Sequence, residues 1–255
     1  MAHDPFYDLV PRPIEPQWRS GSIALLTIDL QYLDAHPSGW MGRLAQLHGG
    51  IDPLRHRWQA IEAILPNVRR LQDAFRAAGE EVMHARVRYR TRTGRDAGKA
   101  YMPDPAAEPI PRVPRDEDFL DAVVPLDDEI IFDKTSSSVF NSTAIDSVLR
   151  RMGIEHLVIT GIVTDGCVEL SARDAADKGY SVTLVSDGCA ASTPEAHVDA
   201  LARLTDGGFI VASTTEEVLR LLDGLAAGAG STGPRPLRSV STTLQEVPPV
   251  KTGDA

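Results

Sequence analysis

The sequence predicts an α/β protein with three layers, in which helices cover both faces of a mostly parallel central sheet. Continuous apolar segments such as residues 23–30 are typical of strands that are buried on both faces of a parallel sheet. These segments alternate with others whose apolar residues recur at helical spacing, which is the order expected of parallel strands joined by helices. A chain of 255 residues is also long enough for one such domain with a sizeable core.

Two strands and a long helix are predicted in the first half of the chain. The segment 23–30 is apolar up to Asp29, and 81–88 predicts the second strand. Between them, helical spacing runs from about 58 to 78, where Pro66 either kinks the helix or begins a second one. Long connections are predicted at 31–57 and 90–118.

The second half repeats short apolar segments and amphipathic helices more regularly. The predicted strands there are 129–133, 157–159, 182–185 and 209–212. The predicted helices are a short turn at 119–123, then 144–152, 168–178, 194–204 and 215–225. This order places all regular structure in one domain, residues 21–225.

The two ends of the chain differ from this domain in composition. Residues 1–20 contain several prolines and predict an extended N-terminal arm. Residues 226–255 are rich in Gly, Pro, Ser and Thr without periodicity and predict a tail. The start of the chain does not have the pattern of a signal peptide, and no apolar segment has the length of a membrane span. We therefore expect a cytoplasmic protein without a membrane partner.

Charge and cysteine content exclude further classes. The chain has 26 Lys and Arg against 36 Asp and Glu, a net charge of −10, so we expect no nucleic-acid partner. Its two cysteines, Cys167 and Cys189, are too few for a disulfide framework.

Three reactive side chains lie where predicted strands end. Cys167 follows a strand and a tight turn at the start of a helix, where exposed N–H groups and the helix dipole favour a thiolate. A buried, inert cysteine is the alternative at this position. Asp29 and Lys134 follow two other strands, and ligands of parallel sheets bind at the carboxyl ends of strands. Taken singly, Asp29 fits a backbone-capping carboxylate and Lys134 a surface lysine.

The segments LLTIDLQ, FDKTSSSVF and VITGIVTDGCVELSARDAADKGY, in this order, resemble those of the isochorismatase-like cysteine hydrolases. That superfamily includes nicotinamidases and N-carbamoylsarcosine, biuret and ureidoacrylate hydrolases. The resemblance covers about residues 20–225 and implies a Rossmann-type fold, a homo-oligomer and an Asp29–Lys134–Cys167 triad. It also implies a cis peptide between Ile162 and Val163, with the N–H groups of Val163 and Cys167 directed at an oxyanion.

Within this superfamily, we expect a metal-free amidohydrolase of small ureido or carbamoyl amides that works through a thioester and needs no cofactor. Nicotinamidases hold a metal with an Asp-x-His pair and a further His, whereas here His84 is followed by arginines. Guanidinium groups suit an anionic or carbonyl-rich substrate, although a solvated loop explains them equally well. The candidate substrate-binding residues are Gln31, Arg86, Arg88, Arg90 and Thr164. A nicotinamidase-like amidase and a catalytically silent binding or scaffold protein are the alternatives.

Overall fold

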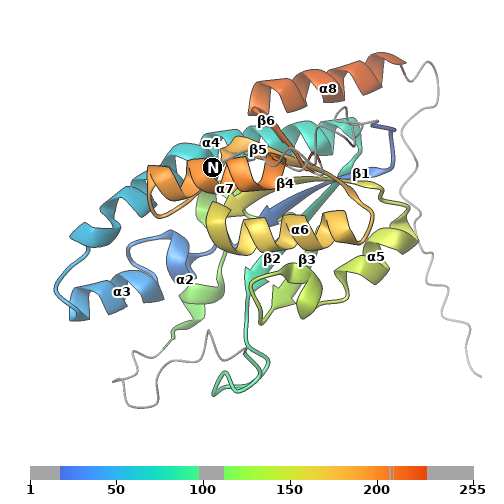
Figure 1. The fold of residues 1–255 in the computed structure, drawn as a ribbon. Coiled ribbons are helices and arrows are strands. Elements are labelled where there is room, and N and C mark those ends of the chain that lie inside the picture. The colour runs from blue at the N-terminus through green and yellow to red at the C-terminus, as the bar shows by residue number, and fades with distance from the viewer. Residues whose placement is uncertain (1–17, 98–111, 207, 209, 229–255) are drawn as a thin grey trace, which may run out of the picture.

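The computed structural model describes residues 18–97, 112–206, 208 and 210–228. Residues 1–17 of the predicted arm and 229–255 of the predicted tail lie outside these described residues. Figure 1 shows the described part as a central sheet flanked by helices.

Six parallel strands form the sheet, in the order β3-β2-β1-β4-β5-β6. The strands are β1 (Ile23–Ile28), β2 (Glu81–Val87), β3 (Ile130–Lys134), β4 (His156–Ile162), β5 (Ser181–Ala190) and β6 (Ile210–Ser213). The predicted fold class is therefore confirmed, with all six predicted strands present. The chain order reverses between β1 and β4, and in open parallel sheets this is the place where ligands bind.

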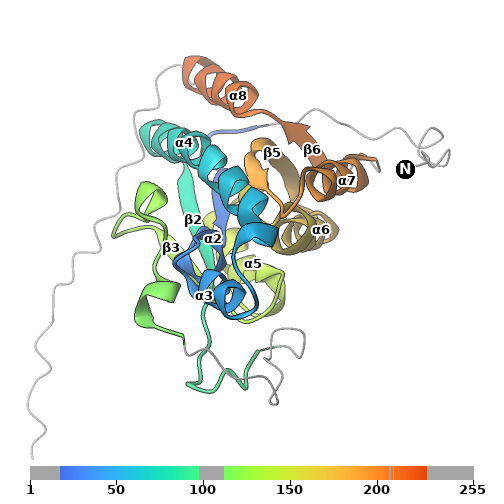
Figure 2. The same cartoon turned by 90° about the vertical axis from the view of Figure 1, so that its left-hand side faces the viewer.

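Helices cover both faces of the sheet, as Figure 2 shows from the side. The long helix α4 packs with α8 on one face, while α5, α6 and α7 lie on the other. The bounds of these helices are α4 (Arg55–Ala78), α5 (Ile145–Met152), α6 (Glu169–Asp177), α7 (Pro194–Thr205) and α8 (Thr215–Gly228). None of the helices within the described ranges has the length and apolarity needed to cross a membrane.

Alternation along β1 divides the core into two layers. Ile23 and Leu25 pack under α4 and α8 with Phe75, whereas Ala24 and Leu26 belong to the cluster under α5 and α6. Successive side chains of a strand point to opposite faces, so a strand in the middle of the sheet is buried on both sides and is mostly apolar. This explains why all six residues of β1 are buried and all but Thr27 are apolar.

The structure decides between the two alternatives left open for Pro66 and changes one expectation. Helix α4 continues through Pro66 as a single element of 24 residues. The connection 31–57, for which no helix was predicted, contains the short helices α2 (Tyr32–Ala35) and α3 (Trp40–Leu47). These helices are held by tertiary contact: at Gly39 an added Cβ would lie 1.5 Å from the carbonyl oxygen of Tyr32.

Three other elements can be compared with their predicted bounds. Thr193 caps α7 by accepting the N–H of Ala196 at 3.2 Å, which agrees with the predicted helix start. Helix α8 extends to Gly228, beyond the predicted boundary at residue 225. Strand β3 includes Lys134 as its last residue, so this lysine belongs to the sheet itself.

Candidate active site

Asp29, Lys134 and Cys167 meet at the carboxyl edge of the sheet. The ammonium of Lys134 lies 2.8 Å from Oδ2 of Asp29 and 3.3 Å from Sγ of Cys167. Its third partner is the carbonyl oxygen of Ser136 at 3.1 Å. An ammonium has three N–H donors, and here each has one acceptor. The structure therefore brings the three residues of the predicted triad together around one cation.

Asp29 is held in an unusual backbone conformation directly after β1. Its φ is 55°, in the left-handed region that a non-glycine residue rarely adopts but that Asp tolerates better than most. Its N–H donates to the carbonyl oxygen of Ala85 at 2.9 Å, which ties this turn to the end of β2. The second carboxylate oxygen, Oδ1, is buried and accepts no hydrogen bond from any described residue. One oxygen of a buried carboxylate is thus left to accept a proton.

Cys167 lies in a single helical turn, Thr164–Val168, that leads directly into α6. Burial raises the pKa of this thiol, the charge of Asp29 raises it further, and the charge of Lys134 opposes both. The thiolate expected from the helix start is therefore disfavoured in the resting protein. The arrangement is a neutral thiol beside a carboxylate, and it needs a base to become a nucleophile.

Lys134 remains an ammonium although its side chain is fully buried. Burial lowers the pKa of this group, but the charge of Asp29 and the hydrogen bonds with Asp29 and Cys167 raise it by more, so the pKa lies above its ordinary value. The lysine therefore supplies a fixed positive charge between the carboxylate and the sulfur. Its amine stays protonated at neutral pH.

Close backbone packing shapes the turn before the cysteine. Gly161 has a φ of 119°, and an added Cβ would lie 2.1 Å from the carbonyl oxygen of Ile28. Only glycine fits at this contact between β4 and β1. The peptide between Ile162 and Val163 is cis, as the family resemblance implied.

Two of the predicted substrate-binding residues are occupied by contacts within the protein. The amide of Gln31 accepts a hydrogen bond from the N–H of Val87 and donates to the carbonyl oxygens of Val87 and Asp116, each at 3.1 Å. The hydroxyl of Thr164 is fully buried and lies 2.8 Å from Nδ1 of His197. Both side chains therefore position the backbone and helices around the triad.

The three predicted arginines in β2 and just after it differ in their partners. Arg86 lies 2.7 Å from the carboxylate of Asp133, and Arg88 pairs with Glu117 and Asp133. The guanidinium of Arg90 donates to the carbonyl oxygen of Ser142 at 3.1 Å. Arg86 and Arg88 therefore already balance carboxylates of the protein.

A second carboxyl group near the triad was not predicted. Asp34, on α2, accepts a hydrogen bond from Arg57 of α4 at 2.7 Å, and Arg57 also donates to Ser192 at 2.9 Å. Burial raises the pKa of Asp34 to about 6, against the lowering effect of Arg57, and the charge of Asp29 adds to the rise. The charge of Asp34 in turn raises the pKa of Cys167. No periodic pattern in residues 31–57 indicates this carboxyl group.

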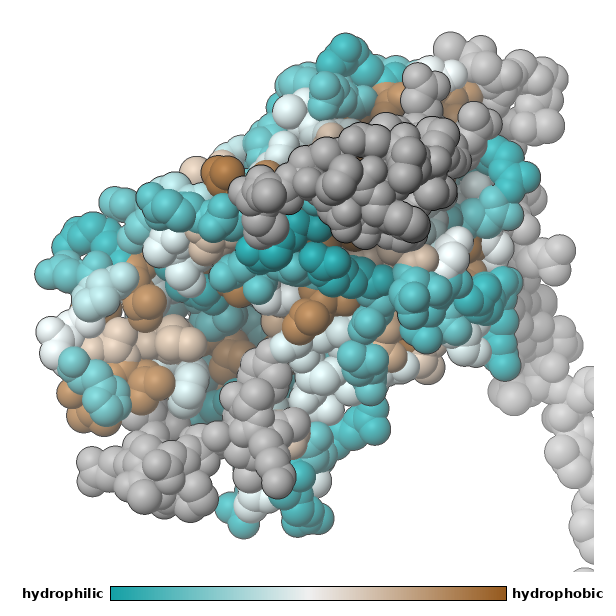
Figure 3. Space-filling model, viewed as in Figure 1, coloured by the Kyte–Doolittle hydropathy of each residue, from teal (hydrophilic) through white to brown (hydrophobic). Residues whose placement is uncertain are grey.

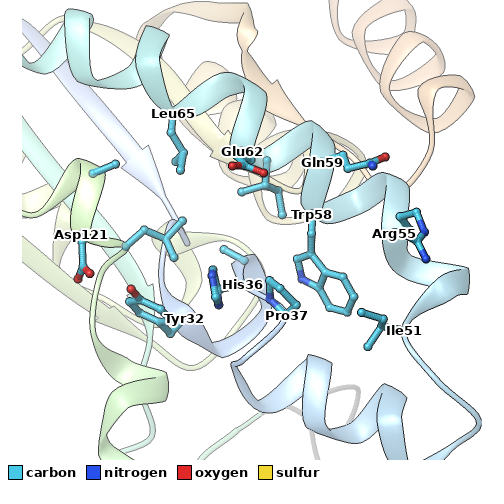
Figure 4. Close-up of a pocket in the computed structure, with 14 residues that line it drawn as sticks. Tyr32, His36, Pro37, Ile51, Arg55, Trp58, Gln59, Glu62, Leu65 and Asp121 are labelled. Atoms are coloured by element: carbon cyan, nitrogen blue, oxygen red, sulfur yellow. The ribbon is translucent and has the colours of Figure 1, made fainter.

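A separate pocket of about 450 Å³ lies between α4 and the segment of α2. Figure 4 shows Tyr32, His36 and Trp58 lining it, with Glu62 and Asp121 at its border. None of the three triad residues lines this pocket. Hydrophobic side chains are also visible on the surface around α3 in Figure 3, and Leu47 of α3 is 56% exposed.

Within the described ranges, no group of three or more His, Cys, Asp or Glu side chains is arranged to hold a metal ion. His84 is instead part of a buried network: its ring nitrogens lie 2.7 Å from the hydroxyl of Thr27 and 2.9 Å from the carboxylate of Glu129. This network lies in the layer between β2 and α4, where Arg76 also contacts Glu129.

Comparisons with known proteins identify relatives of the chain. The family model described as Isochorismatase domain matches residues 24–216. The N-carbamoylsarcosine amidase of an Arthrobacter species is 32% identical over 124 residues, which is 47% of this chain and 47% of that protein. The chain thus spans about half the length of that relative. A probable inactive nicotinamidase of Arabidopsis thaliana is 30% identical over 188 residues, 71% of this chain and 86% of that protein.

Solved structures show the same fold. A cysteine hydrolase from Pseudomonas syringae pv. phaseolicola has a TM-score of 0.65 at 22% identity, over 85% of this chain and all of that chain (100%). An isochorismatase family protein from Desulfovibrio vulgaris has a TM-score of 0.64 at 24% identity, over 79% of this chain and 98% of that chain.

Proposed function

Because the chain belongs to the isochorismatase family, we propose that it is a cysteine-dependent amidohydrolase that cleaves a C–N bond of a small ureido or carbamoyl amide. The observation that best supports this is the contact of one buried ammonium, that of Lys134, with both Asp29 and Cys167. Acyl transfer from an amide needs a sulfur nucleophile, a group that moves a proton to nitrogen, and donors for an oxyanion. The name of the Arthrobacter relative points to the carbamoyl class.

The first half of the reaction removes the amine. Asp29 accepts the proton of Cys167, for which its buried Oδ1 is available, and Sγ attacks the carbonyl carbon. A C–S bond forms while the carbonyl electron pair moves to oxygen, where the N–H groups of Val163 and Cys167 donate to it. Asp29 then gives the proton to the leaving nitrogen, the C–N bond breaks, and a thioester on Cys167 remains.

The second half restores the thiol. A water molecule loses its proton to Asp29 and attacks the thioester carbon, and the C–S bond then breaks. The sulfur takes the proton back from Asp29. Lys134 stays protonated throughout, because its raised pKa keeps the ammonium available to balance the carboxylate or the developing thiolate.

The test is an ammonia-release screen over biuret, triuret, ureidoacrylate, N-carbamoyl amino acids and nicotinamide. We expect release from a ureido or carbamoyl compound, and its loss in Cys167→Ala and Cys167→Ser. Cys189→Ala is the matched control, because Cys189 is buried within the core and its sulfur faces the carbonyl oxygen of Ile159. Full activity in Cys167→Ala would exclude the mechanism, and activity on nicotinamide alone would favour the nicotinamidase-like alternative.

A catalytically silent binding protein is the second candidate, because the Arabidopsis relative is named a probable inactive nicotinamidase. Mass spectrometry of acid-quenched mixtures separates the two. An active enzyme is expected to accumulate an acyl mass increment on Cys167 that is absent in Cys167→Ser. A chain that binds substrate without ammonia release or an increment would be the silent relative.

A further inference from the structure

Arg112 lies at the same end of the sheet as the triad, between two aromatic rings. Its guanidinium lies 4.0 Å from the ring centroid of Tyr89 and 5.7 Å from that of Trp40. It also donates to the hydroxyl of Tyr89 at 2.7 Å. Tyr89 follows β2 and Trp40 begins α3, and Figure 2 shows these two elements at the same end of the molecule. Contacts with two separate segments therefore hold this half-buried cation in place.

Charge balance distinguishes Arg112 from Arg86, Arg88 and Arg115. Arg86, Arg88 and Arg115 each form an ion pair with an aspartate or glutamate. Within residues 18–97, 112–206, 208 and 210–228, no carboxylate forms an ion pair with Arg112. Its neighbours supply π-electrons and a hydroxyl, which orient a guanidinium without neutralising it.

The positive charge of Arg112 also acts on Asp34, a carboxyl group close to the triad. It lowers the pKa of Asp34, the carboxyl group on which the charges of Asp29 and Lys134 also act. Arg112 and the triad therefore lie within electrostatic reach of the same side chain. A substrate that extends from Cys167 past Asp34 would come within reach of this guanidinium.

We propose that Arg112, held by Tyr89 and Trp40, is the residue that binds an anionic group of the substrate, so that the substrate class is an N-carbamoyl or ureido carboxylic acid. This inference rests on the proposed amidohydrolase function. A guanidinium binds a carboxylate with two parallel hydrogen bonds, which fixes both the position and the direction of the substrate. The neutral end, with the scissile C–N bond, then faces Cys167.

The test is a binding measurement on the full-length Cys167→Ala variant, which holds substrate without turnover. Calorimetry compares an N-carbamoyl amino acid with its neutral primary amide, and we expect the acid to bind more tightly. Adding Arg112→Gln is expected to weaken binding of the acid by about ten- to a hundredfold and leave the amide unchanged. Arg112→Lys keeps the charge without the fork, so a smaller, equally selective loss is expected.

Arg115→Gln is the matched control. Arg115 lies 4.0 Å from the ring centroid of Tyr32 but pairs with Asp121, so its loss is expected to leave both affinities unchanged. Equal binding of acid and amide, or an equal loss of both in Arg112→Gln and Arg112→Lys, would overturn the inference. If wild-type protein releases no ammonia from any amide while the acid still binds through Arg112, the proposed hydrolysis fails and the anion site stands.

Discussion

Replacing Lys134 by methionine is expected to destabilise the fold strongly, because it leaves the carboxylate of Asp29 buried without its counter-charge. The two groups are 2.8 Å apart, with side-chain exposures of 0% for Lys134 and 4% for Asp29. At an effective dielectric constant of about 20 the attraction is about 6 kcal/mol. Relaxation and water entry reduce the net effect, and breaking a buried pair typically costs about 3–5 kcal/mol.

The assay is urea unfolding at neutral pH, in which tryptophan fluorescence and circular dichroism detect the loss of structure. A cost of about 3–5 kcal/mol corresponds to a fall in Tm of about 6–20 °C for a domain of this size. The matched control is Arg69→Met, which breaks an ion pair of similar length, 2.9 Å, at exposures of 48% and 52%. That change is expected to cost no more than about 1 kcal/mol.

The double variant Asp29→Asn/Lys134→Met separates charge from packing. Removing both charges is expected to restore part of the stability lost in Lys134→Met, with a coupling of about 1–3 kcal/mol. The raised pKa of Lys134 means that the pair contributes fully below the ordinary lysine pKa of about 10.4 and is lost only as pH rises through the raised value. The cost should thus be constant across the neutral range. Additive single changes, or a Lys134→Met cost no larger than that of Arg69→Met, would refute the reasoning.

Three further predictions concern the backbone and pH. Gly161→Ala is expected to lower the free energy of unfolding by about 1–3 kcal/mol more than Gly21→Ala. The reason is that the new methyl group meets backbone atoms at Gly161 and no atom at Gly21. Equal costs for the two variants would contradict the clash. Burial lowers the pKa of His156 to about 4, so its contribution is present above the unfolded value of about 6.5 and falls by about 3 kcal/mol as pH drops towards the folded value. Urea unfolding of His156→Gln should lack this slope. The raised pKa of Asp34, about 6, has the opposite sign: its contribution is present below about 3.9 and lost as pH rises through the folded value. Asp34→Asn should thus gain stability relative to the wild type over that window, and parallel pH profiles would count against it.

The sheet and the residues at its strand ends were predictable because both depend on local pattern. A strand in the middle of a parallel sheet is buried on both faces, and β1 is apolar at every position except Thr27, whose hydroxyl pairs with His84. The carboxyl ends of parallel strands share one edge, so Asp29, Lys134 and Cys167 were expected to be neighbours before any distance was known.

The parts that depend on tertiary contacts were not predictable. The helices α2 and α3 are only four and eight residues long, and their packing against α4 stabilises them. Arg112 is separated from Tyr89 by 23 residues, and only the fold brings these two side chains into contact. Gln31 was a candidate for substrate binding, and its three hydrogen bonds go to the backbone. Arg86 and Arg88 were likewise assigned without knowledge of the carboxylates beside them.

The contacts of Gln31 bear on how freely the sequence of the neighbouring segments can vary. Its amide holds the end of β2, at Val87, and the segment around Asp116 through main-chain atoms alone. Every amino acid except proline offers the same N–H and carbonyl groups, so side chains in these segments can be exchanged without releasing the anchor. The segments that carry these anchored atoms are therefore free to change in sequence while their paths stay fixed. A library that varies the side chains of these segments and keeps Gln31 should yield folded variants.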